Sequence, residues 1–203
     1  MTSQGAEIRR GLRAASKVVR FQRDALPIFN DSNRAVGISF WALPLFAGLH
    51  VMTSVFAGEI LTAASTIEGV TEIAKERPAG EMTPVIAVLS LIVRWLFPLV
   101  IAYEMARGMA VTRAWPRYVV AANWCAVLQV LPITIGAVVL QAVSAPPATL
   151  QVLLFVTMIW VIAVDWFVAK WALGITGKQA TILLIMMLAS DAVLTQITAA
   201  IIT

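Results

Sequence analysis

Five runs of about 20 mostly apolar residues constrain this chain more than any other feature of its sequence. A run of this length crosses a hydrocarbon layer of about 30 Å when it forms an α-helix with a rise of about 1.5 Å per residue. Hydrophobic residues make up 60% of the 203 and charged residues 13%, whereas soluble domains are about 45–50% apolar and about 25% charged. The sequence therefore predicts an all-α fold, a polytopic membrane helix bundle that follows an N-terminal segment at residues 1–35.

Proline and glycine residues separate the apolar runs, because either residue weakens a helix that would continue through it. The predicted spans are Val36 to Ala57, Val85 to Tyr103, Tyr118 to Val143, Leu150 to Leu173 and Thr181 to Ile202. Twelve of the 15 Lys and Arg residues lie before the first span or in the second and fourth connections, which share one side of the membrane. Basic segments stay in the cytoplasm, so we expect a cytoplasmic N-terminus and a C-terminus across the membrane.

The segment before the first span has the pattern of a basic amphipathic surface helix. At 100° per residue, one arc holds Ile8, Leu12, Ala15, Val18 and Val19. The facing arc holds Arg9, Arg10, Arg13, Lys17, Arg20 and Arg23. Such a helix sinks its apolar arc into the headgroup boundary while its cations attract anionic lipids. A solvated charged tail and a mitochondrial presequence are the alternatives, since both can be rich in arginine.

The first connection, Gly58 to Thr83, is predicted to contain a short helix on the outer surface. Its apolar positions recur at helical spacing, and Glu68, Glu72 and Glu76 form a ladder four residues apart. An acidic face of this kind either docks a basic partner or is simply solvated, and solvation is the commoner case.

Three charged residues, Arg94, Asp165 and Asp191, lie inside the predicted spans. A charge at the centre of a membrane helix costs roughly 2.5–3.5 kcal/mol on insertion scales, so such residues are pairing or functional sites. Arg94 and Asp191 fall near the middle of their spans, and Asp165 lies roughly 6 Å to the cytoplasmic side. One arginine can thus serve two acids and leave one carboxylate without a full counter-charge. The three residues form a static clasp between helices, a proton relay, or unrelated sites.

Four further polar residues inside the spans would line the path of such a relay. They are His50, Asn123, Gln129 and Gln196. Each also suits a packing role, because hydrogen bonds between membrane helices contribute about 0.6 kcal/mol on average. One His and one Cys are too few ligands for a zinc site, and Gly177–Lys178–Gln179 lacks the Ser or Thr of a phosphate-binding loop. We therefore expect no metal, no cofactor, no nucleic-acid partner and no enzymatic activity.

Three stretches of the chain resemble a family of bacterial five-span inner-membrane proteins of uncharacterised function. They are Phe29, Asn30, Asp31 and Ser32 with Gly37, Ser39 and Phe40; Arg117 to Trp124 with Gln129; and Asp165, Trp166 and Phe167 with Ala172 and Leu173. The resemblance implies the bacterial inner membrane and a periplasmic C-terminus. The five-span plan with a cytoplasmic N-terminus is also similar to that of the Yip1 family, which is implicated in membrane organisation and trafficking.

These observations favour a non-enzymatic membrane protein that organises the bilayer or assembles with other membrane proteins. Its expected partners are the lipid bilayer, anionic lipids in particular, and either other membrane proteins or copies of itself. The alternative is a proton-linked small-solute transporter or accessory subunit in which Arg94, Asp165 and Asp191 form the relay.

Overall fold

The computed structural model describes the backbone of residues 4–67 and 84–202. This part of the chain is helical and contains no strand. Five helical stretches in it are long and apolar enough to cross a membrane. They are Asn33–Ala57, Val88–Gly108, Thr112–Ala142, Pro147–Leu173 and Gly177–Thr198. The predicted all-α bundle of five membrane helices is therefore confirmed, and the chain is a multi-pass membrane protein.

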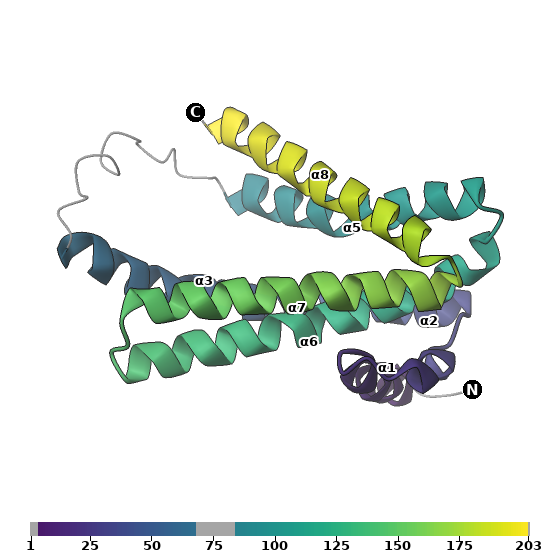
Figure 1. Ribbon diagram of the computed structural model, residues 1–203, viewed down its shortest axis with the longest axis horizontal. Coiled ribbons are helices and arrows are strands. Elements are labelled where there is room, and N and C mark those ends of the chain that lie inside the picture. The colour runs from purple at the N-terminus through teal and green to yellow at the C-terminus, as the bar shows by residue number, and fades with distance from the viewer. Residues whose placement is uncertain (1–3, 68–83, 203) are drawn as a thin grey trace.

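Five long helices form the bundle. They are α3 (Ala42–Ile67), α5 (Pro84–Gly108), α6 (Trp115–Ala142), α7 (Pro147–Leu173) and α8 (Gly177–Ile202). Helix α6 packs against α3 and α7, and the three form one layer in Figure 1. Helices α5 and α8 pack against each other and lie over this layer, to which α8 is joined mainly by its contacts with α7 (Figure 1).

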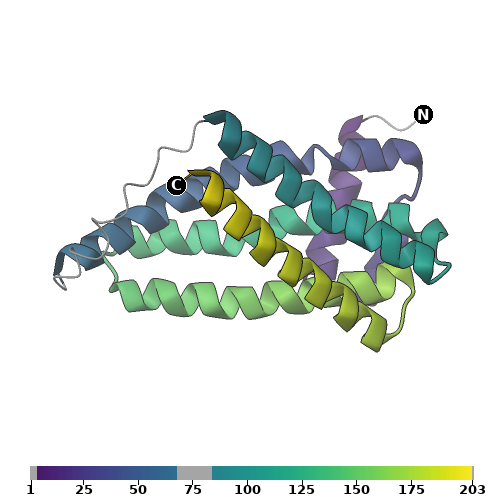
Figure 2. The same ribbon diagram turned by 90° about the horizontal axis from the view of Figure 1, so that it is seen from above.

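The three helices that precede the long ones lie at one end of the bundle. They are α1 (Gln4–Val18), the 3-10 helix η1 (Arg23–Ile28) and α2 (Asn33–Ser39). Helices α1 and α2 both contact α6, and α1, purple in Figure 2, runs across the long axis of the bundle. This end, called the N-terminal end below, also carries the last turn of α7 and the first turn of α8.

The bounds of the last three spans lie within four residues of the prediction, and proline or glycine marks several of them. Helices α6 and α7 each carry a proline in their first two positions, where the missing N–H has no helical partner. Gly174 follows α7 with φ +71°, the left-handed conformation that glycine adopts readily at the end of a helix.

The first span differs from the prediction at both ends. Helix α2 is capped by Ser32, whose Oγ accepts a hydrogen bond from the Ala35 N–H at 3.2 Å. The helix is interrupted after Ser39, and α3 begins at Ala42. Helix α3 then continues to Ile67. Residues 58–67 of the predicted connection therefore continue the first span and do not begin a separate helix, because one glycine without a proline does not stop a helix. The rest of the predicted surface helix, with Glu68, Glu72 and Glu76, lies outside the described residues.

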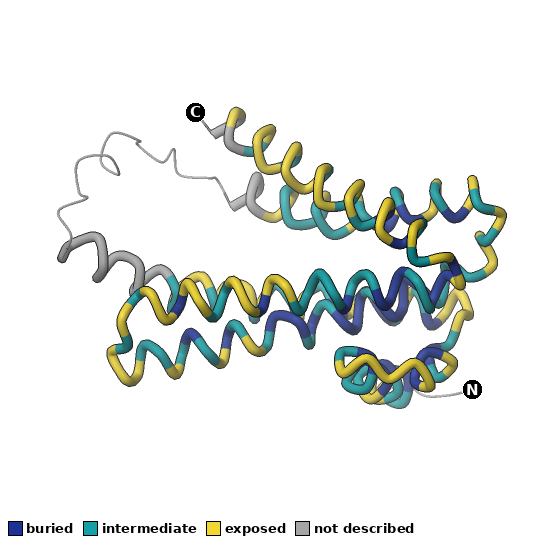
Figure 3. The backbone as a smooth tube through the Cα atoms, viewed as in Figure 1, coloured by how far each residue is buried: buried dark blue, intermediate teal, exposed yellow. Residues whose placement is uncertain are grey.

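Buried residues concentrate along α6 and towards the N-terminal end, whereas α8 is largely exposed (Figure 3). Many are small, including Ala14, Ala15, Ala121 and Ala180, each 0% exposed. Small side chains let membrane helices approach closely, because packing rather than water exclusion holds them together. The predicted boundary between residues 35 and 36 falls inside α2, and the N-terminal segment shares one core with the spans.

Candidate functional sites

Helices α5 and α8 bring Arg94 and Asp191 together. Arg94 is the eleventh of 25 residues in α5, and Asp191 is the fifteenth of 26 in α8. The Arg94 Nη1 lies 3.3 Å from the Asp191 Oδ1, and the Arg94 Nη2 donates to the Thr195 Oγ1 at 2.6 Å. The pairing expected from depth in the sequence is thus present, while Thr195 was missed because an uncharged hydroxyl carries little signal in a sequence.

This ion pair lies at the surface of the chain although it is at mid-depth in two membrane-spanning helices. The side chains of Arg94 and Asp191 are 36% and 57% exposed. A hollow of about 250 Å³ beside Arg94 separates parts of α5 and α8 and is lined mainly by apolar side chains such as Leu89 and Val93. Charged residues at this depth normally face protein or a water-filled cavity, so the Arg94 and Asp191 side chains are unsuited to contact with lipid tails.

Asp165 of α7 is not part of this pair. Its Oδ1 accepts a hydrogen bond from the Gln129 Nε2 of α6 at 2.8 Å. Within the described part of the chain, no Lys or Arg nitrogen lies within 4.0 Å of its carboxylate. The predicted cluster of three charges therefore divides into two sites, because matching depths place residues along the membrane normal but do not decide which helices are neighbours.

The other polar residues predicted to line one path have separate surroundings. The Asn123 Nδ2, in a side chain 2% exposed, donates to the Ser39 Oγ of α2 at 2.9 Å, whereas Gln129 faces α7. The His50 ring is exposed and stacks on the Phe46 ring with centroids 5.8 Å apart. Gln196 is also exposed. Asn123 and Gln129 thus join helices, as their packing interpretation implies.

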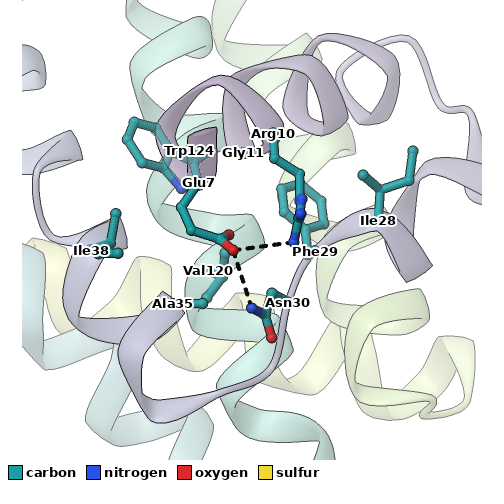
Figure 4. Close-up of a pocket in the computed structure, with 10 residues that line it drawn as sticks. All are labelled: Glu7, Arg10, Gly11, Ile28, Phe29, Asn30, Ala35, Ile38, Val120 and Trp124. Atoms are coloured by element: carbon teal, nitrogen blue, oxygen red, sulfur yellow. Dashed lines mark hydrogen bonds and ion pairs between the residues drawn. The ribbon is translucent and has the colours of Figure 1, made fainter. Parts of the chain in front are cut away.

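The buried arc of the N-terminal helix packs on protein. Gly11 of α1 lies against the indole of Trp124 so closely that an added Cβ would overlap the ring. Glu7, only 7% exposed, accepts from the Arg10 Nη1 at 3.1 Å and from the Asn30 Nδ2 at 3.4 Å (Figure 4). Glu7 was not predicted as a site residue, although it lies on the same arc of α1 as Gly11.

The basic residues of the N-terminal segment lie on two surfaces. Arg9, Arg10, Arg13 and Lys17 line a hollow between α1 and η1. The Arg23 guanidinium instead lies 4.5 Å from the centroid of the Trp171 ring, a cation–π contact, and Arg20 is exposed. Membrane binding by these residues stays a prediction, but its geometry changes, because α6 already covers much of the predicted apolar arc.

Comparison of the chain with protein-family models, with curated proteins and with solved structures gives no match. In the described ranges, no group of three or more His, Cys, Asp or Glu residues is placed to hold a metal ion. Function therefore has to be inferred from the geometry of the charged sites.

Proposed function

We propose that the chain is a non-enzymatic protein of the bacterial inner membrane that organises the bilayer by associating with itself through the α5–α8 pair. Its N-terminus would lie in the cytoplasm and its C-terminus in the periplasm. The observation that carries the proposal is the exposed Arg94–Asp191 ion pair at mid-depth in two apolar helices.

The exposed ion pair favours association because the hydrocarbon layer contains no water to solvate its charges. A guanidinium and a carboxylate in contact satisfy part of each other's charge, but their remaining N–H groups and oxygen need polar partners. Arg94 makes contacts through Nη1 and Nη2, and Asp191 through Oδ1. Covering the pair with another protein surface removes these groups from lipid and supplies partners for them.

A second copy of the chain fits this surface because the ion pair is complementary to itself. In a two-fold interface the same patch occurs on both subunits, so the Arg94 of each copy can face the Asp191 of the other. The apolar side chains around the pair supply packing area, since Leu89, Val93 and Leu188 are 56%, 43% and 49% exposed.

Cysteine cross-linking in native membranes tests this proposal. The chain's single cysteine, Cys125, is 1% exposed and should not form cross-links of its own. Leu188→Cys lies three residues before Asp191 and on the same side of α8. Met186→Cys is the matched control, because Met186 is 44% exposed but points to the opposite side of the helix. Oxidation should give a dimer of the Leu188→Cys chain and little dimer of the Met186→Cys chain.

The other outcomes of this cross-linking contradict specific parts of the proposal. A Leu188→Cys adduct with a different protein would replace the second copy by that partner. Equal yields for the two cysteines would mean that the dimers form by random collision, and no adduct at either position would mean that the α5–α8 face is not an interface.

The Asp165–Gln129 contact favours a second candidate function, proton-linked transport. A carboxyl group between two spans, hydrogen-bonded to a neutral amide without a cation within 4.0 Å in the described residues, is a group that could exchange a proton. Proteoliposomes loaded with a pH-sensitive dye should then show proton flux that Asp165→Asn abolishes. Tight vesicles without flux for any added solute would exclude this candidate.

A further inference from the structure

We propose that the basic side of α1 binds the phosphate groups of anionic phospholipids in a hollow between α1 and η1. The hollow has a volume of about 800 Å³ and is lined by Ala6, Arg9, Arg10, Arg13, Lys17 and Ile28. This site uses residues other than those of the α5–α8 face, and it is independent of self-association.

Helix α1 has three sides with different surroundings. The side with Gly11, Ala14 and Val18 is buried, and Gly11 lies against α6. At 100° per residue, Ile8 and Leu12 fall on a second, apolar side, and the basic residues of the hollow fall on a third. The apolar and basic sides therefore flank the contact with α6 and face different directions.

Two contacts made by residues that follow α1 show in which direction its apolar and basic sides face. The Val19 carbonyl accepts a hydrogen bond from the Trp160 Nε1 at 3.2 Å, and Trp160 lies roughly 20 Å from the end of α7 at the helical rise. Arg23, at the start of η1, lies over Trp171 in the last turn of α7. Because Ile28 of η1 lines the basic hollow, the basic side is turned towards the N-terminal end of the bundle.

The apolar side, which Val19 continues, is then turned away from the N-terminal end, and Ile8, Leu12 and Val19 are half-buried against the core. Figure 2 shows α1 crossing the long axis of the bundle, which is the orientation of a helix lying in the membrane interface. In that orientation the cations of the hollow lie at the level of the lipid headgroups.

Three of the four cations in the hollow lack an acidic partner. Arg10 pairs with Glu7 at 3.1 Å, but no carboxylate oxygen of the described residues lies within 4.0 Å of Arg9, Arg13 or Lys17. These three follow one another at intervals of four residues, a spacing at which like charges on a helix repel. An anion bound in the hollow would remove this repulsion.

Phospholipid headgroups match the length and chemistry of this stripe. Arg9 to Lys17 covers roughly 12 Å along the helix, which suits two phosphate groups better than one. Arginine side chains bind phosphate oxygens through two parallel N–H groups, and Ala6 and Ile28 give the hollow an apolar wall for the glycerol and acyl part of a lipid. Free phosphate would leave that wall unused.

Native mass spectrometry of the full chain in detergent, titrated with lipid, tests the proposal. Diphosphatidylglycerol, phosphatidylglycerol and phosphatidylcholine are the probes. The triple variant Arg9→Gln, Arg13→Gln, Lys17→Gln should bind diphosphatidylglycerol at least about tenfold more weakly, since each cation near an anionic surface contributes up to about fivefold. Binding of phosphatidylcholine should be unchanged.

The matched control removes three positive charges at the same end of the bundle but outside the hollow, as Arg113→Gln, Arg117→Gln, Lys178→Gln. It should weaken diphosphatidylglycerol binding less than about threefold. Equal losses in the two triple variants would show that diffuse charge, and not the hollow, attracts the lipid. If inorganic phosphate at millimolar concentration displaces the lipid, the hollow is a site for free anions.

Folding of both variants is checked by their helical circular dichroism and thermal unfolding. Should the triple variant in α1 unfold, the single variants Arg13→Gln and Arg113→Gln provide the same comparison with one charge removed in each. Equal affinities of these two would overturn the proposal.

Discussion

Helix α6 and the α5–α8 pair differ in the charge and the exposure of the polar groups that they place within the membrane. Along α6, polar side chains are neutral and buried, as with Asn123, which is 2% exposed and bonded to Ser39, and Thr134, which lies 2.6 Å from the Thr53 hydroxyl. Between α5 and α8, a neutral contact of the Ser90 and Thr198 hydroxyls at 3.4 Å is accompanied by the charged and exposed pair of Arg94 and Asp191. The first region is complete within one chain, whereas the second has polar groups that need a further partner.

The two regions also differ in the side chains at their helix contacts. At the N-terminal end, glycine and alanine bring α1 and α2 against α6, so a short amide or hydroxyl reaches across the contact. Between α5 and α8 there is a hollow of about 250 Å³, and beside it the long Arg94 side chain reaches Asp191 and Thr195. A mutation along α6 should therefore affect folding most, and a mutation in the α5–α8 pair should affect association most.

The largest loss of stability is expected at the contact of α1 with α6. Gly11→Ala places a Cβ into the Trp124 indole and should lower the free energy of unfolding by about 1–3 kcal/mol. Gly5→Ala on the same helix meets nothing within 4 Å and should be neutral or stabilising by up to about 1 kcal/mol. Denaturant unfolding in detergent measures both, and equal effects would refute the close contact.

A loss of about 1–2 kcal/mol is expected when Asn123→Ala removes the buried hydrogen bond to Ser39. Ser39→Ala should have a smaller effect, since it leaves the Asn123 amide in place. The double variant should lose less than the sum of the two single variants, because both remove the same bond. Strict additivity in the same unfolding assay would show that the two side chains do not interact.

Asp191→Asn should change the unfolding of the detergent-solubilised monomer by no more than about 1 kcal/mol, as for exposed ion pairs. In membranes, however, it should reduce the Leu188→Cys cross-link several-fold. A mutation between α5 and α8 would thus affect association more than folding, whereas a mutation along α6 would affect folding more. A large loss of monomer stability with unchanged cross-linking would mean that the pair serves only folding within one chain.

The smallest effect is expected at Asp165. Asp165→Asn has the same shape and keeps an oxygen for the Gln129 amide, so stability should change by less than about 0.5 kcal/mol. Gln129→Leu removes the hydrogen-bond donor and should be more damaging, because it leaves the carboxyl group without that partner. A reversed order in thermal unfolding would show that the contact is not a simple hydrogen bond.

The positions of the long helices were predictable because a membrane span requires a long apolar run and because proline and glycine mark its ends. The pairing of Arg94 with Asp191 was predictable from their matching depths. Asp165 lies at nearly the same depth but pairs with Gln129, because neighbours within the membrane plane depend on side-chain packing around each helix. The break between Ser39 and Ala42 was likewise hidden, since the apolar run continues through it.

The most direct test of self-association through Arg94 and Asp191 uses two variants that each keep one charge. Arg94→Gln keeps the acid, and Asp191→Asn keeps the base. We expect energy transfer between labelled copies in liposomes to fall for each variant alone and to recover when the two are mixed, because the acid of one chain then meets the base of the other. Transfer in the mixture no greater than in the separate variants would contradict pairing between copies.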